Sequence, residues 1–213
     1  MKVVIENVCK QFRGKDGAIL SVLEDINLTV AEEELVVLVG PSGCGKSTLL
    51  NMVGGLLAPT TGRIYFDDLK KDKDPAVGVV FQDIGLFPWR TVRQNIAFGL
   101  EETGVAAKEQ TERLEHYINM VGLTGFESAY PYQLSGGMRQ RAALIRTLVT
   151  DPQILLLDEA FSALDYQTRL VVNEDIYKII KKENKTAILV THDIAEAISM
   201  ADRVIVLSQR PGT

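Results

Sequence analysis

Hydrophobic and polar positions along the chain predict strands near both ends and helices in the middle. Leu35–Val39 is apolar throughout and ends at Gly40, which is typical of a strand buried on both faces. β-Branched or alternating residues predict the other strands, and apolar residues spaced three to four apart predict helices. The expected strands are 3–5, 26–30, 35–39, 63–66, 77–81, 154–157, 187–191 and 204–207. The expected helices are 46–57, 92–100, 106–121, 137–150, 168–183 and 194–201.

The order of these elements predicts an α/β fold with a mostly parallel sheet. Strands alternate with helices on both sides of a segment, from about residue 91 to 150, that shows only helical spacing. A chain of 213 residues is long enough for one globular domain or for one core that carries an inserted lobe. Residues 70–74 are expected to form a short charged turn.

Composition indicates which partners and which cellular compartment to expect. The net charge of -5 predicts no general attraction to nucleic acid or anionic lipid. Two cysteines, Cys9 and Cys44, cannot form a disulfide framework, so a reducing compartment is expected. No apolar run approaches the ~20 residues needed to cross a bilayer, and the first residues lack the core of a signal peptide. Any membrane part must therefore come from another chain.

A phosphate-binding loop is predicted between the strand 35–39 and the following helix. The sequence there matches the pattern GxxxxGK[ST], and a chance glycine-rich turn is disfavoured by the strand before it and the helix after it. Glycines let backbone N–H groups turn inward around phosphate oxygens. Lys46 is expected to reach the β- and γ-phosphates, and the Ser47 hydroxyl to ligate Mg²⁺. The expected nucleotide-binding residues are Gly40, Pro41, Ser42, Gly43, Cys44, Gly45, Lys46, Ser47 and Thr48.

Two acidic residues follow the apolar strand 154–157. Asp158 at the edge of this strand is placed to bind Mg²⁺ directly or through water, and Glu159 to polarise an attacking water as general base. A strand that merely ends in two solvated acids is common. The position of this pair after the phosphate loop favours the catalytic interpretation.

The octet Leu-Ser-Gly-Gly-Met-Arg-Gln-Arg at 134–141 lies between the phosphate loop and the acidic pair. It resembles the signature motif of ABC ATPases. The resemblance covers nearly the whole chain and implies a RecA-like P-loop NTPase core, an N-terminal antiparallel β subdomain and an inserted helical subdomain. It implies one nucleotide-binding domain over 1–213, with the β subdomain and core at 1–86 and 152–213 and the helical subdomain at 87–151.

The resemblance also implies roles for single residues. Gln82 is similar to the Q-loop glutamine, which senses Mg²⁺ and water, and His192 to the switch histidine at the γ-phosphate. Phe12 stands where an aromatic residue stacks on adenine, with Val22 beside it, and Asp165 closes a D-loop at 162–165. Each of these residues could instead have an ordinary structural role. Phe12 could be a core aromatic, and His192 a structural histidine. The shared order of all these motifs favours the functional interpretation.

Ser135, Gly136 and Gly137 are expected to open a helix whose free N–H groups face outward. These donors suit the γ-phosphate held by a second copy of the chain, so ATP would join a head-to-tail dimer with two-fold symmetry. An ordinary serine N-cap with tightly packed glycines is compatible with this role.

Further partners follow from the resemblance. The segment 85–100 is similar to the part of bacterial importer ATPases that receives a coupling helix of the integral membrane permease, so the contact is expected over 82–99. Phe87 and Trp89 would be exposed there, the alternative being internal packing. An importer also implies a solute-binding protein, acting indirectly, and a place at the cytoplasmic face of the membrane; no nucleic acid is expected. Residues 88–89, 161–165 and 209–212 resemble the nitrate/sulfonate/taurine subgroup.

Three alternatives stay open at this point: an ABC ATPase of a non-transport process, a cassette of another importer or exporter subgroup, and an inactive ATP-binding scaffold. The chain also departs from the family pattern. Ala160 stands where most relatives have proline, and residues 32–34 are glutamates where a glycine is usual. Relatives usually continue for some tens of residues beyond Gly212, so the chain is either shortened or a minimal version.

Overall fold

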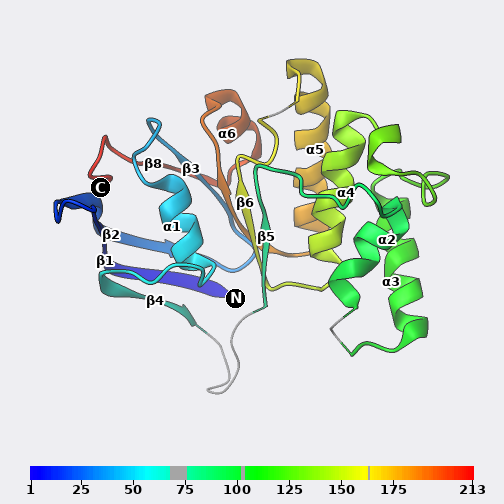
Figure 1. Ribbon diagram of the computed structural model, residues 1–213, viewed down its shortest axis with the longest axis horizontal. Coiled ribbons are helices and arrows are strands. Elements are labelled where there is room, and N and C mark those ends of the chain that lie inside the picture. Colours follow the sequence, from blue (N-terminus) through cyan, green and yellow to red (C-terminus); the bar gives the residue numbers. More distant parts are fainter. Residues whose placement is uncertain (68–75, 102–103, 163) are drawn as a thin grey trace.

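The computed structural model describes residues 1–67, 76–101, 104–162 and 164–213. Two sheets and a group of helices follow one another across the molecule (Figure 1). The charged turn expected at 70–74 lies outside the described residues, and so does Ala163 of the expected D-loop.

An antiparallel sheet of three strands forms the N-terminal part. Its strands are β1 (Lys2–Arg13), β2 (Ile19–Val30) and β4 (Thr61–Asp67), in the order β2-β1-β4. β1 and β2 extend well beyond the expected strands 3–5 and 26–30. Their outer halves also pair, for example Gln11 with Ser21 and Phe12 with Leu20, across several register shifts. This pairing carries Phe12 and Val22 to the same end of the sheet.

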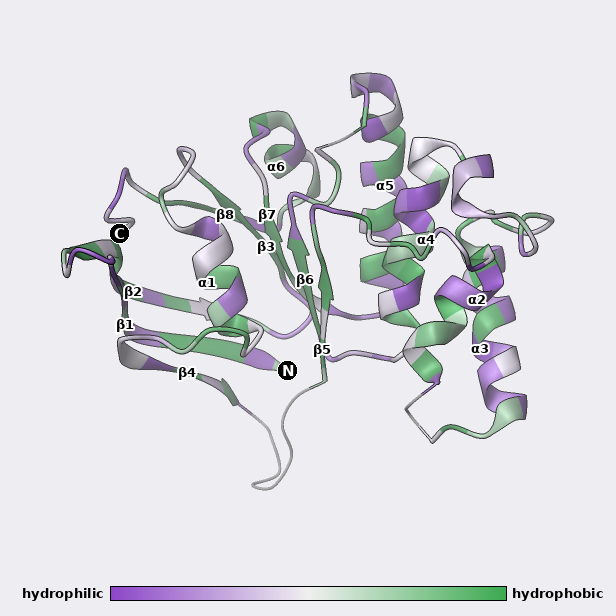
Figure 2. Cartoon of the chain, viewed as in Figure 1, coloured by the Kyte–Doolittle hydropathy of each residue, from purple (hydrophilic) through white to green (hydrophobic). Residues whose placement is uncertain are grey.

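A parallel sheet of five strands forms the centre of the fold, in the order β5-β6-β7-β3-β8. Its strands are β3 (Leu35–Val39), β5 (Val77–Val80), β6 (Ile154–Asp158), β7 (Thr186–Val190) and β8 (Arg203–Val206). Alternate residues of β3 pack into different hydrophobic cores, with Val37 on one face and Val36 on the other. The expected two-sided burial of this strand is confirmed, and Figure 2 shows the central strands as mainly hydrophobic.

Helices cover both faces of the parallel sheet. α1 (Lys46–Val53) packs on the face that also meets the antiparallel sheet. The opposite face is covered by α4 (Gly136–Leu148), α5 (Tyr166–Lys182) and α6 (Ile194–Met200), so α1 and α4 lie on different sides of the sheet (Figure 1).

Between β5 and β6 the described elements are all helical, as expected. They are α2 (Val92–Ala97), η1 (Phe98–Leu100), α3 (Ala107–Met120), η2 (Pro131–Gln133) and α4. Thr91 caps α2 through a reciprocal pair of hydrogen bonds with Gln94. The proposed subdomain limits at residues 87 and 151 stay a prediction. No helix in the described ranges is long and apolar enough to span a membrane.

Several helix limits differ from the expected ones, and two of these differences have a clear local cause. α1 ends at Val53 rather than at residue 57, because Gly54 forms its C-cap and Gly55 adopts a left-handed φ of 71° that no helix continues. α5 begins two residues earlier than expected, because the Asp165 side chain accepts a hydrogen bond from the Thr168 N–H and caps it.

Candidate functional site

The loop between β3 and α1 wraps around a lysine. The Lys46 ammonium group donates hydrogen bonds to the carbonyl oxygens of Gly40 (2.8 Å) and Pro41 (3.1 Å), and its side chain is buried. Gly45 has φ 112°, and a Cβ there would lie 2.6 Å from Leu23 Cδ2, so only glycine fits. Gly45 caps α1 without a side-chain hydrogen bond, which leaves the first N–H groups of α1 to an anionic ligand.

Ser47 in α1 and Asp158 at the end of β6 lie side by side. The Ser47 hydroxyl donates to Asp158 Oδ1 at 2.9 Å. Burial raises the pKa of Asp158 above its ordinary value, although the hydrogen bond from Ser47 opposes this. A hydroxyl and a carboxylate are the hard oxygen ligands that Mg²⁺ uses together with phosphate oxygens. No cluster of three or more histidine, cysteine or acidic residues suited to a metal occurs in the described ranges. The donor set fits a Mg²⁺ that is held jointly with a nucleotide.

Glu159 and His192 face each other across the ends of β6 and β7. His192 Nδ1 lies 3.3 Å from Glu159 Oε2, and the Glu159 side chain is less exposed than that of His192. Glu159 has a left-handed φ of 44°, and its N–H donates to the Val190 carbonyl at 2.9 Å. This unusual turn sets the direction in which the Glu159 side chain leaves the backbone.

Gln82 follows β5 and is exposed. Its amide donates to the Ser162 hydroxyl at 3.5 Å, and that hydroxyl donates to the Glu159 carbonyl at 2.9 Å. The structure therefore links Gln82 to the turn that carries Glu159. The expected contact of Gln82 with a metal stays a prediction.

An open cavity of about 390 Å³ joins the base-binding and phosphate-binding candidates. Phe12 lies at its edge, with its ring 5.0 Å from the Lys10 ammonium. Leu20 was not among the expected residues; it reaches the cavity because it pairs with Phe12 across the β1–β2 hairpin. The lining residues are Phe12, Leu20, Val22, Ser42, Gly43, Gly45, Lys46, Ser47, Thr48 and Glu159.

The signature residues lie elsewhere. Ser135 is the N-cap of α4 and accepts a hydrogen bond from the Met138 N–H at 3.3 Å. Gly137 is buried against α5, where a Cβ would lie 3.0 Å from Val172 Cγ2. None of the signature residues lines the cavity around Lys46, and α4 lies across the sheet from α1 (Figure 1).

Arg169 connects the D-loop to the turn after β7, a link that no sequence motif revealed. It donates to the Leu164 carbonyl at 2.8 Å and to Asp193 Oδ2 at 3.0 Å. Asp193 follows His192 directly and caps α6. Hydrogen bonds from Thr168 hold the pKa of Asp165 below its ordinary value. Asp165 therefore serves α5 as a charged N-cap.

Comparison with known proteins defines the class. The family model described as ABC transporter matches residues 23–162, and the chain belongs to this family. A chain 50% identical is the uncharacterized ABC transporter ATP-binding protein of Methanocaldococcus jannaschii, aligned over 100% of this chain and 79% of the relative. A nitrate import ATP-binding protein of Synechocystis is 44% identical, over 100% of this chain and 80% of its own length.

A solved structure agrees with the fold. The dimeric post-hydrolysis state of an ATP-binding cassette, bound to ADP and Pi, superposes with a TM-score of 0.80 at 33% identity. The match covers 99% of this chain and 97% of the cassette. The expected P-loop NTPase fold and the ABC resemblance are confirmed.

Proposed function

We propose that this chain is the ATP-hydrolysing subunit of an ABC importer for a small solute of the nitrate/sulfonate/taurine class. The observation that carries the ATPase activity is the single cavity shared by Phe12, Val22, Lys46 and Glu159. The 44% identity to a nitrate import ATP-binding protein supports the importer direction and the solute class. The resemblance of residues 88–89 and 209–212 to the nitrate/sulfonate/taurine subgroup supports them as well.

The residues of the cavity divide the work of phosphoryl transfer. Phe12 and Val22 receive the adenine, and the N–H groups of the loop hold the phosphates with Lys46. Ser47 and Asp158 would hold a Mg²⁺, which would supply neutralisation of the charge that develops on the phosphate oxygens.

Glu159 accepts the proton of the attacking water. His192 Nδ1 lies 3.3 Å from the Glu159 carboxylate, and we expect its ring to contact the γ-phosphate. Gln82, linked to the same turn through Ser162, is placed to report the state of the site to the helical region.

A second copy completes the site. The N-terminus of α4 is the positive end of the helix dipole, which stabilises an anion, and glycines occupy its first two positions. It does not line the cavity around Lys46 of its own chain. In a head-to-tail dimer Ser135 and Gly137 of one copy meet the γ-phosphate bound by the other. Hydrolysis removes the shared contact, so the dimer opens.

We infer that the membrane permease contacts an aromatic cluster beside α2. Trp89 is 71% exposed, and its ring centroid lies 5.5 Å from that of Phe87. Phe98 packs edge-on to Phe87 and is itself partly exposed. Arg90 lies against both phenylalanine rings and pairs with Glu101 at 2.5 Å. A partly exposed aromatic cluster beside a helix with one buried face suits an amphipathic helix of another protein. This contact would hold the chain at the cytoplasmic face of the membrane.

Isolation of the tagged chain from membranes of its source cells tests the importer assignment. An integral membrane subunit should accompany the parent chain but not Trp89→Ala. The matched control is Ile198→Ala, which truncates another side chain that is 74% exposed. In proteoliposomes, ATP turnover should rise with the solute-binding protein loaded with nitrate, a sulfonate or taurine. Recovery of ribosomes or DNA in place of a membrane subunit would contradict the importer function.

A further inference from the structure

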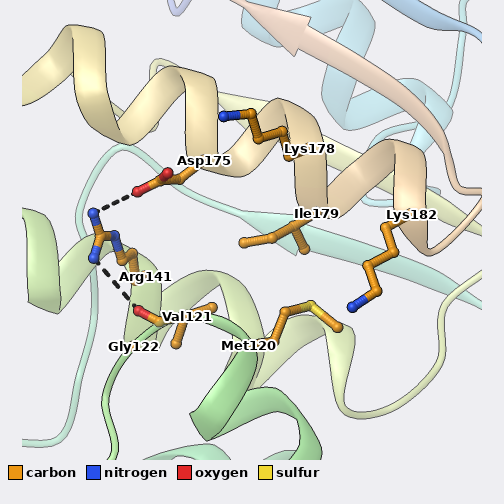
Figure 3. A pocket seen from close by; sticks show the side chains of 8 residues that line it. All are labelled: Met120, Val121, Gly122, Arg141, Asp175, Lys178, Ile179 and Lys182. Atoms are coloured by element: carbon orange, nitrogen blue, oxygen red, sulfur yellow. Dashed lines mark hydrogen bonds and ion pairs between the residues drawn. The ribbon is translucent and has the colours of Figure 1, made fainter.

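A second pocket, of about 380 Å³, lies where α3, α4 and α5 meet (Figure 3). None of its lining residues borders the cavity around Lys46, and none belongs to the exposed aromatic cluster beside α2. Its volume lies at the lower end of the range of about 300–1,000 Å³ for small-molecule sites. It is lined by Met120, Val121, Gly122, Arg141, Asp175, Lys178, Ile179 and Lys182.

The polar part of this pocket is mainly cationic. Arg141 pairs with Asp175 at 2.5 Å and donates to the Val121 carbonyl at 3.4 Å. Lys178 pairs with Glu174, which lies outside the lining, but both side chains are largely exposed, so this pair is weak. The Lys182 ammonium group makes no hydrogen bond or ion pair with any described residue. The pocket therefore keeps an excess of positive charge even when Glu174 is counted, on a chain whose net charge is -5.

The remaining wall is apolar. Figure 3 shows Ile179 of α5 and Met120 at the end of α3 facing each other, with the Lys182 ammonium group directed towards Met120. Ile179 and Val121 are buried in the main hydrophobic core, so this wall is fixed. Cationic groups beside a firm apolar wall suit a ligand with one charged end and a short apolar body.

Lysines near the end of a helix also stabilise its dipole, which accounts for Lys182 at the last position of α5. Stabilisation of the α5 dipole does not explain Arg141, which comes from another helix, and it does not explain the apolar wall. We propose that this pocket binds a small amphipathic monoanion, an organic carboxylate or sulfonate with a short apolar chain. A ligand there would bridge α5 to the end of α3 and touch α4 six residues after Ser135.

Titration of the ¹⁵N-labelled full chain with hexane-1-sulfonate and hexanoate, followed by amide NMR shifts, tests this site. Saturable shifts at 120–122 and 178–182 are expected, with a Kd below about 1 mM. Sulfate carries the charge without the tail and hexan-1-ol the tail without the charge, so both should bind at least about tenfold more weakly.

Variants separate the charge from the shape of the pocket. Lys178→Gln with Lys182→Gln should weaken hexane-1-sulfonate binding at least about tenfold, whereas arginine at both positions should retain it. Lys108→Gln, on the exposed face of α3, is the matched control and should change nothing. Equal binding of hexan-1-ol or sulfate, an unchanged Kd in the glutamine variant, or no saturation by about 10 mM would overturn the proposal.

Discussion

At the scale of single residues, the proposed mechanism makes hydrolysis depend on Glu159. Its side chain projects from the left-handed turn after β6, and its carboxylate lies 3.3 Å from His192. Glutamine preserves the shape but cannot accept a proton. Glu159→Gln should therefore lower ATP turnover at least about 100-fold, with ATP affinity retained. Phosphate release and nucleotide binding measure the two effects. Turnover within a fewfold of the parent would contradict the role of Glu159 as base.

Asp158 gives the site a pH dependence. Burial raises its pKa, so this carboxylate takes up a proton at a higher pH than an ordinary aspartate does. The protonated form cannot bind a cation, and the gain in ATP affinity caused by Mg²⁺ should fall as the pH is lowered towards that pKa. Ser47→Ala removes both a proposed Mg²⁺ ligand and the hydrogen bond that lowers this pKa, so the gain should be smaller at every pH and its loss should begin at a higher pH. ATP affinity measured with and without Mg²⁺ from pH 8 to pH 5 checks this; a gain that does not change would contradict it.

Sequence motifs predicted most of these residues because phosphate chemistry constrains both residue type and spacing. Lys46, Ser47, Asp158 and Glu159 meet as expected. Leu20 was missed because it reaches the cavity through hairpin pairing, and any apolar residue could stand there. Arg169 was missed because its partners are mostly backbone carbonyls, which leave no trace in the sequence.

At the scale of elements, the start of α4 has both a structural and a proposed functional role. Ser135→Ala removes the N-cap of α4, and Thr91→Ala removes the N-cap of α2, which serves as the matched control. Each should lower the free energy of unfolding by about 1 kcal/mol. Only Ser135→Ala should also weaken the ATP-bound dimer. Urea unfolding and analytical ultracentrifugation separate the two effects. If both variants form the ATP-bound dimer equally well, Ser135 has no role in the proposed interface.

Arg169 holds the D-loop and the turn after His192 in one arrangement. Arg169→Ala should lower ATP turnover about tenfold while ATP affinity stays within about twofold, because it repositions groups that do not hold the nucleotide. Lysine should not restore turnover fully, since it lacks the forked geometry of the guanidinium. Arg113→Ala, which breaks an ion pair with Glu109 on α3, is the control and should leave turnover unchanged. A loss of ATP affinity equal to the loss of turnover would contradict a positioning role for Arg169.

Element order was predictable because buried strands are apolar throughout and the helices have one apolar face. The first and last residues of the elements were less predictable. At the outer ends of β1 and β2, residues 11–13 and 19–20 are exposed and register shifts interrupt the alternation, so no regular hydrophobic pattern marks their pairing. The end of α1 depends on the left-handed Gly55 rather than on a change in polarity.

At the scale of the whole molecule, the sheet separates the two halves of the proposed catalytic site. The phosphate loop and α1 lie on one side and the start of α4 on the other (Figure 1). The sequence predicted both motifs and the fold that carries them. Their separation within one chain is what makes a second copy necessary in this account.

Photocrosslinking from position 138, beside the signature, tests this arrangement most directly. The variant chain carries Glu159→Gln and a photoreactive residue in place of Met138. A ¹⁵N-labelled batch of this chain would be mixed with an unlabelled batch in the presence of ATP and Mg²⁺. Mass spectrometry should find position 138 joined to residues 40–48 in peptides that combine one labelled and one unlabelled half. Crosslinks to that loop only within a single chain would contradict the account.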